Sequence, residues 1–156
     1  MNKEEAIQYI NNNGTVPTQF QNDHDVMIYA LSERIHDFSN FSKDLLNNRQ
    51  FVLNMVLMNG LHLKYAGSET IINPDTKLSI DRPLNNNFII GYAAIRQCIH
   101  AFPHLSKQLQ QNRSILRHIA ETSIKYFKSV VDKRLQISPE LYLYLLQKNN
   151  YLALNN

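Results

Sequence analysis

The sequence feature that most constrains the fold is an internal repeat. Four segments share one pattern: a polar Asn or Asp, an apolar helical run, and a second apolar stretch that ends in Leu or Ile. They begin near Asp23, Asn48, Asn86 and Asn112. Short segments that recur in this way are typical of helical repeat proteins, in which each unit buries its apolar face against the next. We therefore predict an all-α fold, a short stack of helix-turn-helix-like repeats in one compact domain.

The spacing of these starts sets the predicted boundaries of the single domain, 1–156. The predicted repeat units are 22–45, 46–71, 85–109, 111–135 and a partial unit at 137–156, with an insertion at 72–84. The insertion holds Pro74 and Pro83 and is expected to be an irregular surface loop. No helix breaker separates the two halves of 112–135, so the sequence allows either one long helix or a helical hairpin there.

Each repeat unit is predicted to place apolar residues in one stripe along its first helix. Apolar residues at i, i+1, i+4 and i+5 lie on one side of a helix with 3.6 residues per turn. The predicted equivalent core positions are Phe51, Val52, Met55, Val56, Ile89, Ile90, Ile115 and Ile119. The Asn or Asp that opens each unit is expected to accept hydrogen bonds from free N–H groups of the first helical turn.

Residues 45–71 follow the pattern L-x-x-D-R-E-x-V-L-x-A-V-x-x-N-G-x-A-L-x-Y-A-S. The matching residues include Arg49, Val52, Leu53, Val56, Asn59, Gly60, Leu63, Tyr65 and Ala66. Asn48, Gln50 and Met55 depart from the pattern, which usually has Asp, Glu and Ala there. This segment resembles a family of uncharacterised helical repeats found in bacteria and giant viruses. The resemblance implies a helical repeat fold without catalytic activity, and it makes a bacterial effector, or a regulator of one, an expected class.

Charge is distributed unevenly along the chain, whose net charge is +3. Residues 1–81 carry six basic and ten acidic side chains, whereas 82–136 carry nine basic and two acidic ones. The predicted partner-binding residues, which share one face if 112–135 is a single helix, are Arg113, Arg117, Lys125 and Lys128. The expected partner is another protein with an acidic surface, and a nucleic acid is the alternative.

No sequence motif indicates catalysis, a metal site or a cofactor. His100 and His104 have the i, i+4 spacing of a zinc-binding helix, but Pro103 lies between them. Ala101 also stands where a zinc protease has glutamate. Cys98, the single cysteine, lies among apolar residues and is expected to be a buried thiol. We therefore expect no enzyme activity, no catalytic residues, no metal ligands and no cofactor.

The leading functional hypothesis is a non-catalytic protein–protein interaction module. The alternative is a nucleic-acid or nucleoprotein binder, including an anti-defence inhibitor, that uses a basic helix face. A homodimer could form through the tyrosine-rich C-terminal unit, 137–156, because the open end of a repeat stack leaves an apolar face. No apolar stretch is long enough to span a membrane. A single cysteine and the lack of an apolar leader after Met1 favour the cytoplasm of a bacterium or, for a translocated effector, of its host.

Overall fold

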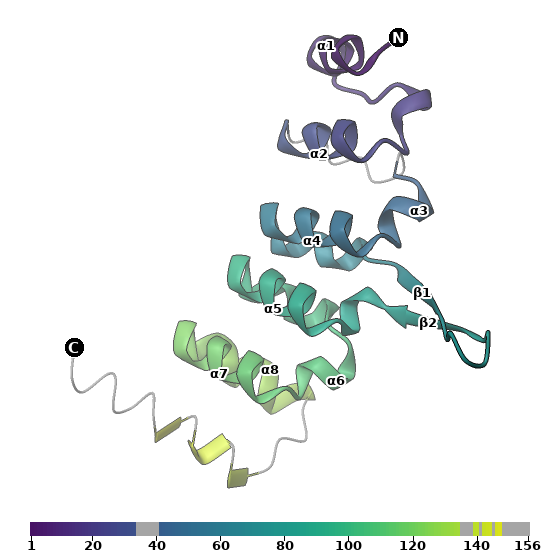
Figure 1. Ribbon diagram of the computed structural model, residues 1–156. Coiled ribbons are helices and arrows are strands. Elements are labelled where there is room, and N and C mark those ends of the chain that lie inside the picture. The colour runs from purple at the N-terminus through teal and green to yellow at the C-terminus, as the bar shows by residue number, and fades with distance from the viewer. Residues whose placement is uncertain (34–40, 135–138, 141, 145, 148–156) are drawn as a thin grey trace. The chain divides into compact units, whose positions relative to one another are not determined.

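The computed structural model describes residues 1–33, 41–134, 139–140, 142–144 and 146–147. In this part of the chain the fold is mainly helical with one small two-stranded sheet, which confirms the predicted fold class (Figure 1). The contacts divide the chain into an N-terminal part, Met1–His104, and a C-terminal part, Leu105–Asn156, and each is described by itself. Among the described helices, none combines the length and apolarity that crossing a bilayer requires.

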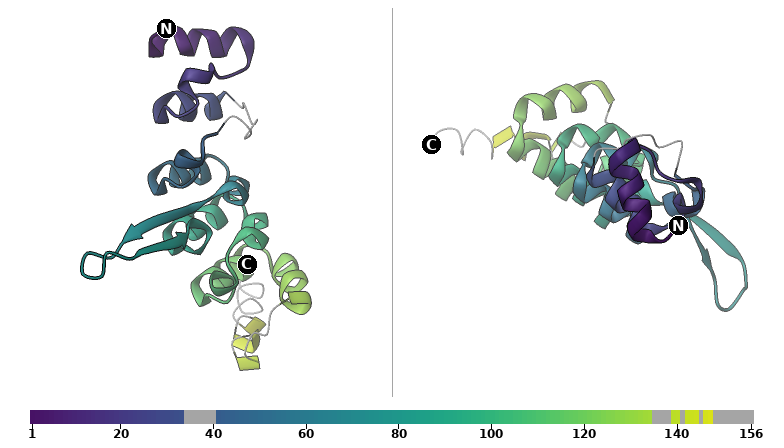
Figure 2. Two further views of the ribbon diagram at one scale, coloured as in Figure 1. Left: turned by 90° about the vertical axis from the view of Figure 1, so that its right-hand side faces the viewer. Right: turned by 90° about the horizontal axis from the view of Figure 1, so that it is seen from above.

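The N-terminal part is built from α-helices, short 3₁₀ helices (η) and one β-hairpin. Its elements are α1 Lys3–Asn13, η1 Thr18–Phe20, α2 His24–Ser32, α3 Lys43–Leu46, α4 Arg49–Met58, η3 Gly60–Tyr65, β1 Ser68–Ile72, β2 Ser79–Pro83, η4 Leu84–Asn86, α5 Phe88–Gln97 and η5 Ile99–His104. Helix α4 packs between α2 and α5, and the short helices η3 and η5 lie beside each other as a second row behind α4 and α5 (Figures 1 and 2).

The repeat arises because the same local signals recur before and after each long helix. Asp23, Asn48 and Asn87 cap α2, α4 and α5 through side-chain oxygens that accept N–H bonds from the first turn. Helices α4 and α5 both end at a residue with extended backbone, Asn59 (φ −153°) and Cys98 (φ −154°). The chain then turns back into η3 or η5, so each repeat is a long helix followed by a short one.

The C-terminal part also pairs a capped helix with a second helix, here a full α-helix, and it resolves the alternative left open for 112–135. It contains α6 Lys107–Gln110, α7 Arg113–Thr122 and α8 Ile124–Arg134. Asn112 caps α7, and Ser123 adopts the same extended backbone (φ −154°) that ends α4 and α5. The Ser123 hydroxyl then accepts the N–H of Tyr126, so it opens α8 in place of a glycine or proline break. The segment is therefore a pair of packed helices. Most of the partial unit 137–156 lies outside the described residues.

The buried stripe matches the prediction in α4 and α7 but not in α5. The buried residues of α4 are Phe51, Val52, Met55 and Val56, and Ile115 and Ile119 are buried in α7. Ile90 is also buried, whereas Ile89 is 53% exposed, so the assignment of Ile89 to the core was wrong. The α5 stripe is Ile90, Gly91, Ala94 and Ile95. The stripe predicted for α5 was shifted by one residue, because Gly91 presents no apolar side chain and because the cap is Asn87 rather than Asn86.

The insertion at 72–84 is not an irregular loop, and that prediction was wrong. Strands β1 and β2 pair antiparallel, with Ile71 opposite Ile80 and Thr70 opposite Asp81. The Thr70 hydroxyl donates a hydrogen bond to the Asp81 carboxylate at 2.7 Å. Alternation of side chains between the two faces of a strand puts Glu69, Ile71 and their partners on one face. The insertion is thus a hairpin that projects from the side of α4 and α5 (Figure 2).

The base of the hairpin is tied to the linker between α3 and α4. The Gly67 N–H donates to the Leu46 carbonyl at 2.8 Å, and the Ser68 N–H donates to the Asn47 side-chain oxygen at 2.9 Å. The Leu84 N–H, directly after β2, donates to the Gly67 carbonyl at 2.8 Å. A Cβ on Gly67 would lie 2.0 Å from that Asn47 oxygen, so the anchor requires glycine. The hairpin is therefore fixed beside the start of α4.

A second glycine sets the distance between successive repeats. Gly60 begins η3 and is buried against α5, where an added Cβ would lie 2.1 Å from the Ala94 carbonyl oxygen. Only a residue without a side chain permits this approach of η3 to the α5 backbone. The Asn-Gly pair that the repeat pattern contains is thus needed for packing between helices as well as for ending α4.

Candidate functional site

An open groove runs over α4 and α5 beside the base of the hairpin. It consists of three adjoining hollows of about 580, 550 and 530 Å³. The first two hollows share Arg49 and Glu69, the first and third share Phe88, and the second and third share Ile89. These shared walls make the three hollows one continuous surface, the α4–α5 groove.

The walls of the groove are rows of side chains spaced four residues apart. Arg49, Leu53 and Leu57 form one row along α4. On α5 the rows are Phe88, Tyr92 and Arg96, and Ile89, Ala93 and Gln97. Side chains four residues apart lie on one face of an α-helix, and these rows lie beside the buried stripe. The groove therefore follows the axes of both helices.

Large apolar side chains are exposed along this groove. Ile89 is 53% exposed, Leu57 49% and Phe88 42%, and the Phe88 ring stacks on Tyr92 with 5.5 Å between centroids. Single exposed apolar residues are common, whereas a contiguous exposed set along a groove is unusual on a protein surface. The α4–α5 groove has this character.

Three arginines border the groove and are available to an incoming group. Arg49 and Arg82 line the hollow at the hairpin, and Arg96 lines the opposite hollow. None of the three makes a salt bridge within the described residues. Two carboxylates, Glu69 and Asp81, line the hairpin end, and Asp81 already accepts the Thr70 hydroxyl. The groove therefore offers apolar contacts between a hairpin end of mixed charge and an opposite end that carries Arg96.

The hairpin forms one wall of the groove. Glu69, Ile71 and Arg82 line the hollow at its base, and the strand register places all three on one face of the sheet. Because backbone hydrogen bonds hold Gly67 against α3, this wall stays beside Phe88 and Arg49. The structure thus gives the inserted hairpin a position at the candidate site.

The predicted partner-binding residues lie on two helices of the C-terminal part. Arg113 and Arg117 are on α7 and Lys125 and Lys128 on α8, and all four are exposed. The break at Ser123 means that they do not form the single-helix row that the sequence allowed. The Arg117 guanidinium donates to the Glu121 carboxylate at 2.8 Å. Their role in partner binding stays a prediction.

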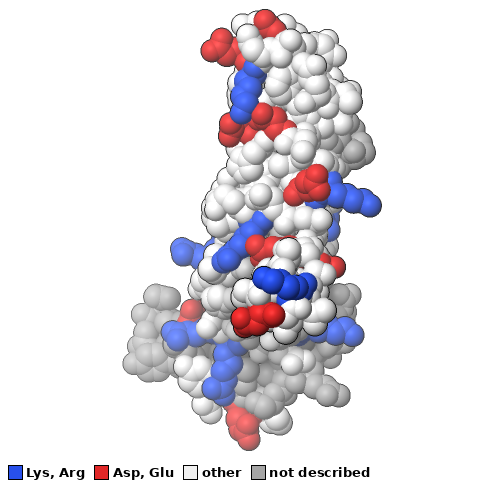
Figure 3. Space-filling model, turned by 45° about the vertical axis from the view of Figure 1, so that its right-hand side comes forward, with Lys and Arg blue, Asp and Glu red and all other residues white. Residues whose placement is uncertain are grey.

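The sequence did not identify the groove, although it held a usable signal. Helices α4 and α5 carry more apolar residues than one buried stripe needs, since Leu53, Leu57 and Ile89 lie outside it. The net-charge profile drew attention to 82–136, whereas the structure spreads charge widely. On the face shown in Figure 3, acidic and basic side chains are intermixed and separated by uncharged areas.

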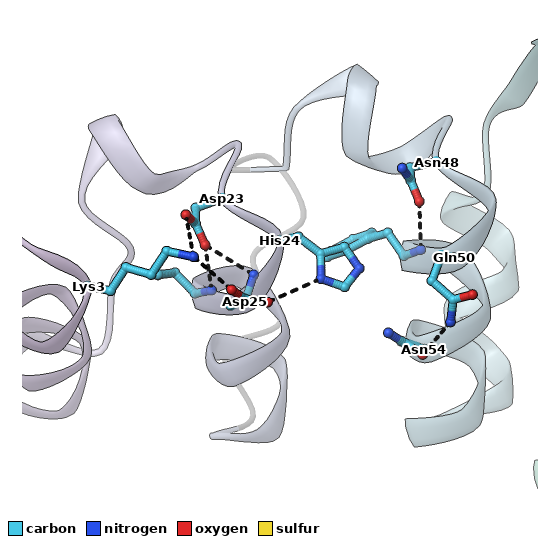
Figure 4. A network of polar contacts seen from close by, with 9 residues as sticks. Lys3, Asp23, His24, Asp25, Asn48, Gln50 and Asn54 are labelled. Carbon is cyan, nitrogen blue, oxygen red and sulfur yellow. Dashed lines mark hydrogen bonds and ion pairs between the residues drawn. The ribbon is translucent and has the colours of Figure 1, made fainter.

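A polar cluster joins α1, α2 and α4, and its role is structural (Figure 4). The Lys3 ammonium lies 3.0 Å from the Asp23 carboxylate and 2.7 Å from Asp25, which links α1 to α2. The His24 ring packs edge-on against Phe51 with 5.2 Å between centroids, which links α2 to α4. Burial raises the pKa of Asp23, but the Val26 N–H and the Lys3 ammonium lower this pKa by more.

The remaining candidate groups do not form a reactive centre in the described part of the chain. His100 and His104 lie on η5, where residues four apart point about 120° away from each other around a 3₁₀ helix. Cys98 ends α5 and is half-buried, so it is less enclosed than the sequence predicted. Within the described ranges, no three His, Cys, Asp or Glu residues are grouped so as to hold a metal ion.

Comparison with known proteins identifies no relative of this chain. No protein-family model matches the chain, and neither a curated protein nor a solved structure matches it. The resemblance of 45–71 to the helical repeat family therefore stays an expectation. The functional conclusion depends on the geometry and chemistry of the α4–α5 groove.

Proposed function

We propose that this protein is a non-catalytic protein-binding module that holds its partner in the α4–α5 groove. The observation that carries the proposal is the row of exposed apolar residues, Leu57, Phe88 and Ile89, between unpaired arginines. Aromatic side chains and arginine are the types most enriched at protein interfaces and among their energetic hot spots. The groove thus combines the composition of an interface with the open shape that a macromolecule can enter.

Helical repeats favour such a role on physical grounds. Each repeat presents a similar helix at a regular interval, so neighbouring helices build a continuous surface without any catalytic centre. Here the capped helices α4 and α5 supply the floor of the groove, and the anchored hairpin supplies a side wall. We place this activity in the cytoplasm, since a single cysteine suits a reducing compartment.

A nucleic acid is the second candidate partner. The observation that favours it is the exposed basic set on α7 and α8, Arg113, Arg117, Lys125 and Lys128. Protein is preferred for the groove because its exposed apolar side chains, Leu57, Phe88 and Ile89, suit a protein interface and make no favourable contact with phosphate groups. A nucleic-acid complex would weaken steeply with salt, whereas one dominated by apolar contacts would not.

Site-specific photo-crosslinking tests the proposal. A photoreactive phenylalanine analogue in place of Ile89 lies in the groove, and the same analogue in place of Tyr9 on α1 is an exposed control outside it. We expect a discrete protein adduct from position 89 only, and its loss in a Phe88→Asp background that keeps the wild-type helical circular dichroism. Equal adducts from both positions, or adducts that nuclease removes, would contradict a protein-binding groove.

A further inference from the structure

We infer that the occupant of the α4–α5 groove is an amphipathic acidic α-helix of the partner, an inference that rests on the proposed function. The shape of the groove is the first argument. Arg49 of α4 and Phe88 of α5 share one hollow, and Leu57 and Arg96 share another, so the two helices run side by side in the same direction. Each has ten residues, which gives a groove about 15 Å long, the length of about three helical turns.

The spacing of the apolar side chains is the second argument. Leu53 and Leu57 on one wall, and Ile89 and Ala93 on the other, recur every four residues. A helix places its own apolar anchors at i, i+3 or i+4, and i+7, which matches such rows. An extended strand would bring backbone N–H and C=O groups into this apolar seam. They would find no backbone partners there, because the backbone groups of α4 and α5 are already hydrogen-bonded within the helices. A helix satisfies its backbone internally and buries only side chains.

The charges at the two ends are the third argument. Arg96 lies one residue before the end of α5, and Arg49 is the first residue of α4. With Arg82 on the hairpin, guanidinium groups that make no salt bridge within the described residues stand at both ends of the apolar seam. Glu69 and Asp81 offset the charge of the two at the hairpin end, so the net positive charge lies at Arg96. Guanidinium pairs with carboxylates through two parallel hydrogen bonds. An incoming helix with Asp or Glu beside Arg96 therefore complements the charge of the groove.

Defined peptides test the occupant on the full chain. The probe is a fluorescent amphipathic helix of about 12 residues with leucines on one face and glutamates elsewhere, a length that covers the groove. Matched peptides replace every glutamate by lysine, or scramble the order to remove the apolar face, and a short DNA duplex stands for nucleic acid. By fluorescence anisotropy we expect the acidic helix to bind at least about tenfold more tightly than the other three, with a gain of helical circular dichroism.

Variants assign the binding to the groove. We expect Arg96→Glu to weaken the acidic peptide about tenfold, whereas Lys107→Glu, at an exposed basic residue on α6 outside the groove, leaves its affinity unchanged. The Arg49→Glu, Arg96→Glu double variant should reverse the preference and bind the lysine peptide more tightly than the acidic one. All of these positions are exposed, so thermal unfolding should match the wild type.

Each outcome decides the inference. Absence of acidic-peptide binding, equal binding of the scrambled peptide, tighter binding of the duplex, or loss of affinity in Lys107→Glu but not Arg96→Glu would each overturn it. The proposed function is judged separately. If position 89 crosslinks a protein partner while the acidic peptide does not bind, the groove is a protein site with a different occupant. If both experiments fail, the proposed function fails as well.

Discussion

The repeats built on α4 and α5 have the same backbone plan and distribute large and small side chains differently. In α4 the buried stripe is Phe51, Val52, Met55 and Val56, and the glycine, Gly60, starts the following short helix. In α5 the same stripe contains Gly91 and Ala94, and Ile99 starts the short helix. At these equivalent positions, one repeat thus has a large side chain where the other has a small one.

This difference shows how adjacent repeats fit each other. Gly60 of one repeat meets the Ala94 backbone of the next, so the closest approach falls where both repeats are small. The large Phe51 side chain of α4 faces the other way, toward α2, where it contacts His24 and Phe41. Equivalent positions in the repeat therefore share a backbone environment without sharing a side-chain size.

The largest expected effect comes from comparing a buried residue of α4 with an exposed residue of α5. Phe51→Ala should lower the free energy of unfolding by about 4 kcal/mol, because it empties a fully buried aromatic site. Ile89→Ala should change it by less than about 0.5 kcal/mol, because that side chain is more than half exposed. Urea denaturation followed by circular dichroism measures both. A large loss at Ile89 would mean that the α5 stripe follows the sequence-based register after all.

The second effect concerns the glycine between the repeats. Gly60→Ala should cost about 3 kcal/mol, since its Cβ would overlap the Ala94 carbonyl oxygen. Ile99→Ala, at the equivalent position of the next repeat, should cost less because Ile99 is only half-buried. Adding Ala94→Gly should not rescue Gly60→Ala, because the overlap is with backbone. Rescue in this double variant, measured by urea denaturation, would contradict the close approach.

The sequence predicted the fold where every local signal agreed. The caps at Asn48 and Asn112 stand three residues before the first buried residue of their helices, and the stripes there were assigned correctly. In α5 the same spacing from Asn87 would have given the right register, but adjacent asparagines and Gly91 obscured it. The hairpin was missed because Pro74 and Pro83 indicated a loop, although Ile71 and Ile80 are strand-forming residues. The anchoring at Gly67, which stabilises the hairpin, is a tertiary contact that sequence patterns do not show.

The third effect tests whether the caps are equivalent despite the different stripes. Asn48→Ala and Asn87→Ala should each destabilise by about 1 kcal/mol, since each removes the acceptor for first-turn N–H groups. Asn48→Asp and Asn87→Asp should retain most of the stability because a carboxylate also caps. Thermal unfolding gives the comparison. A cost at only one of the two positions would show that the repeats do not share this signal.

The smallest effect uses Asp23, which caps α2 where α4 and α5 have asparagine. The folded-state pKa of Asp23 lies below its ordinary value of 3.8, so its stabilisation is present above pH 3.8 and is lost as pH falls through the folded-state pKa. Asp23→Asn keeps a capping acceptor without this titration. Between about pH 5 and pH 3 the wild type should therefore lose slightly more stability than the variant. Parallel pH profiles for both proteins would contradict this role.

The candidate site was harder to predict than the fold, for a physical reason. A groove forms from side chains of different elements, here Arg49, Arg82 and Phe88, whose proximity depends on how the hairpin is anchored. Sequence spacing reports neighbours within one helix only, so it singled out Arg113 and Arg117 instead. The additional apolar residues of α4 were visible in the sequence. Only a structure shows whether such residues widen the buried stripe or form a second, exposed apolar face.

The anchored base of the hairpin has a consequence for the reach of the protein. The tip is closed by its own bonds, with the Asn73 N–H donating to the Leu78 carbonyl and the Lys77 N–H to the Asn73 carbonyl, both at 2.9 Å. Because side chains alternate along a strand, two further residues in each strand would keep Ile71 and its partner on the same face. Each such addition would extend the arm by about 7 Å without disturbing the helices beneath. Hairpin length therefore sets how far this wall extends beyond the α4–α5 groove, independently of the packing of the helices.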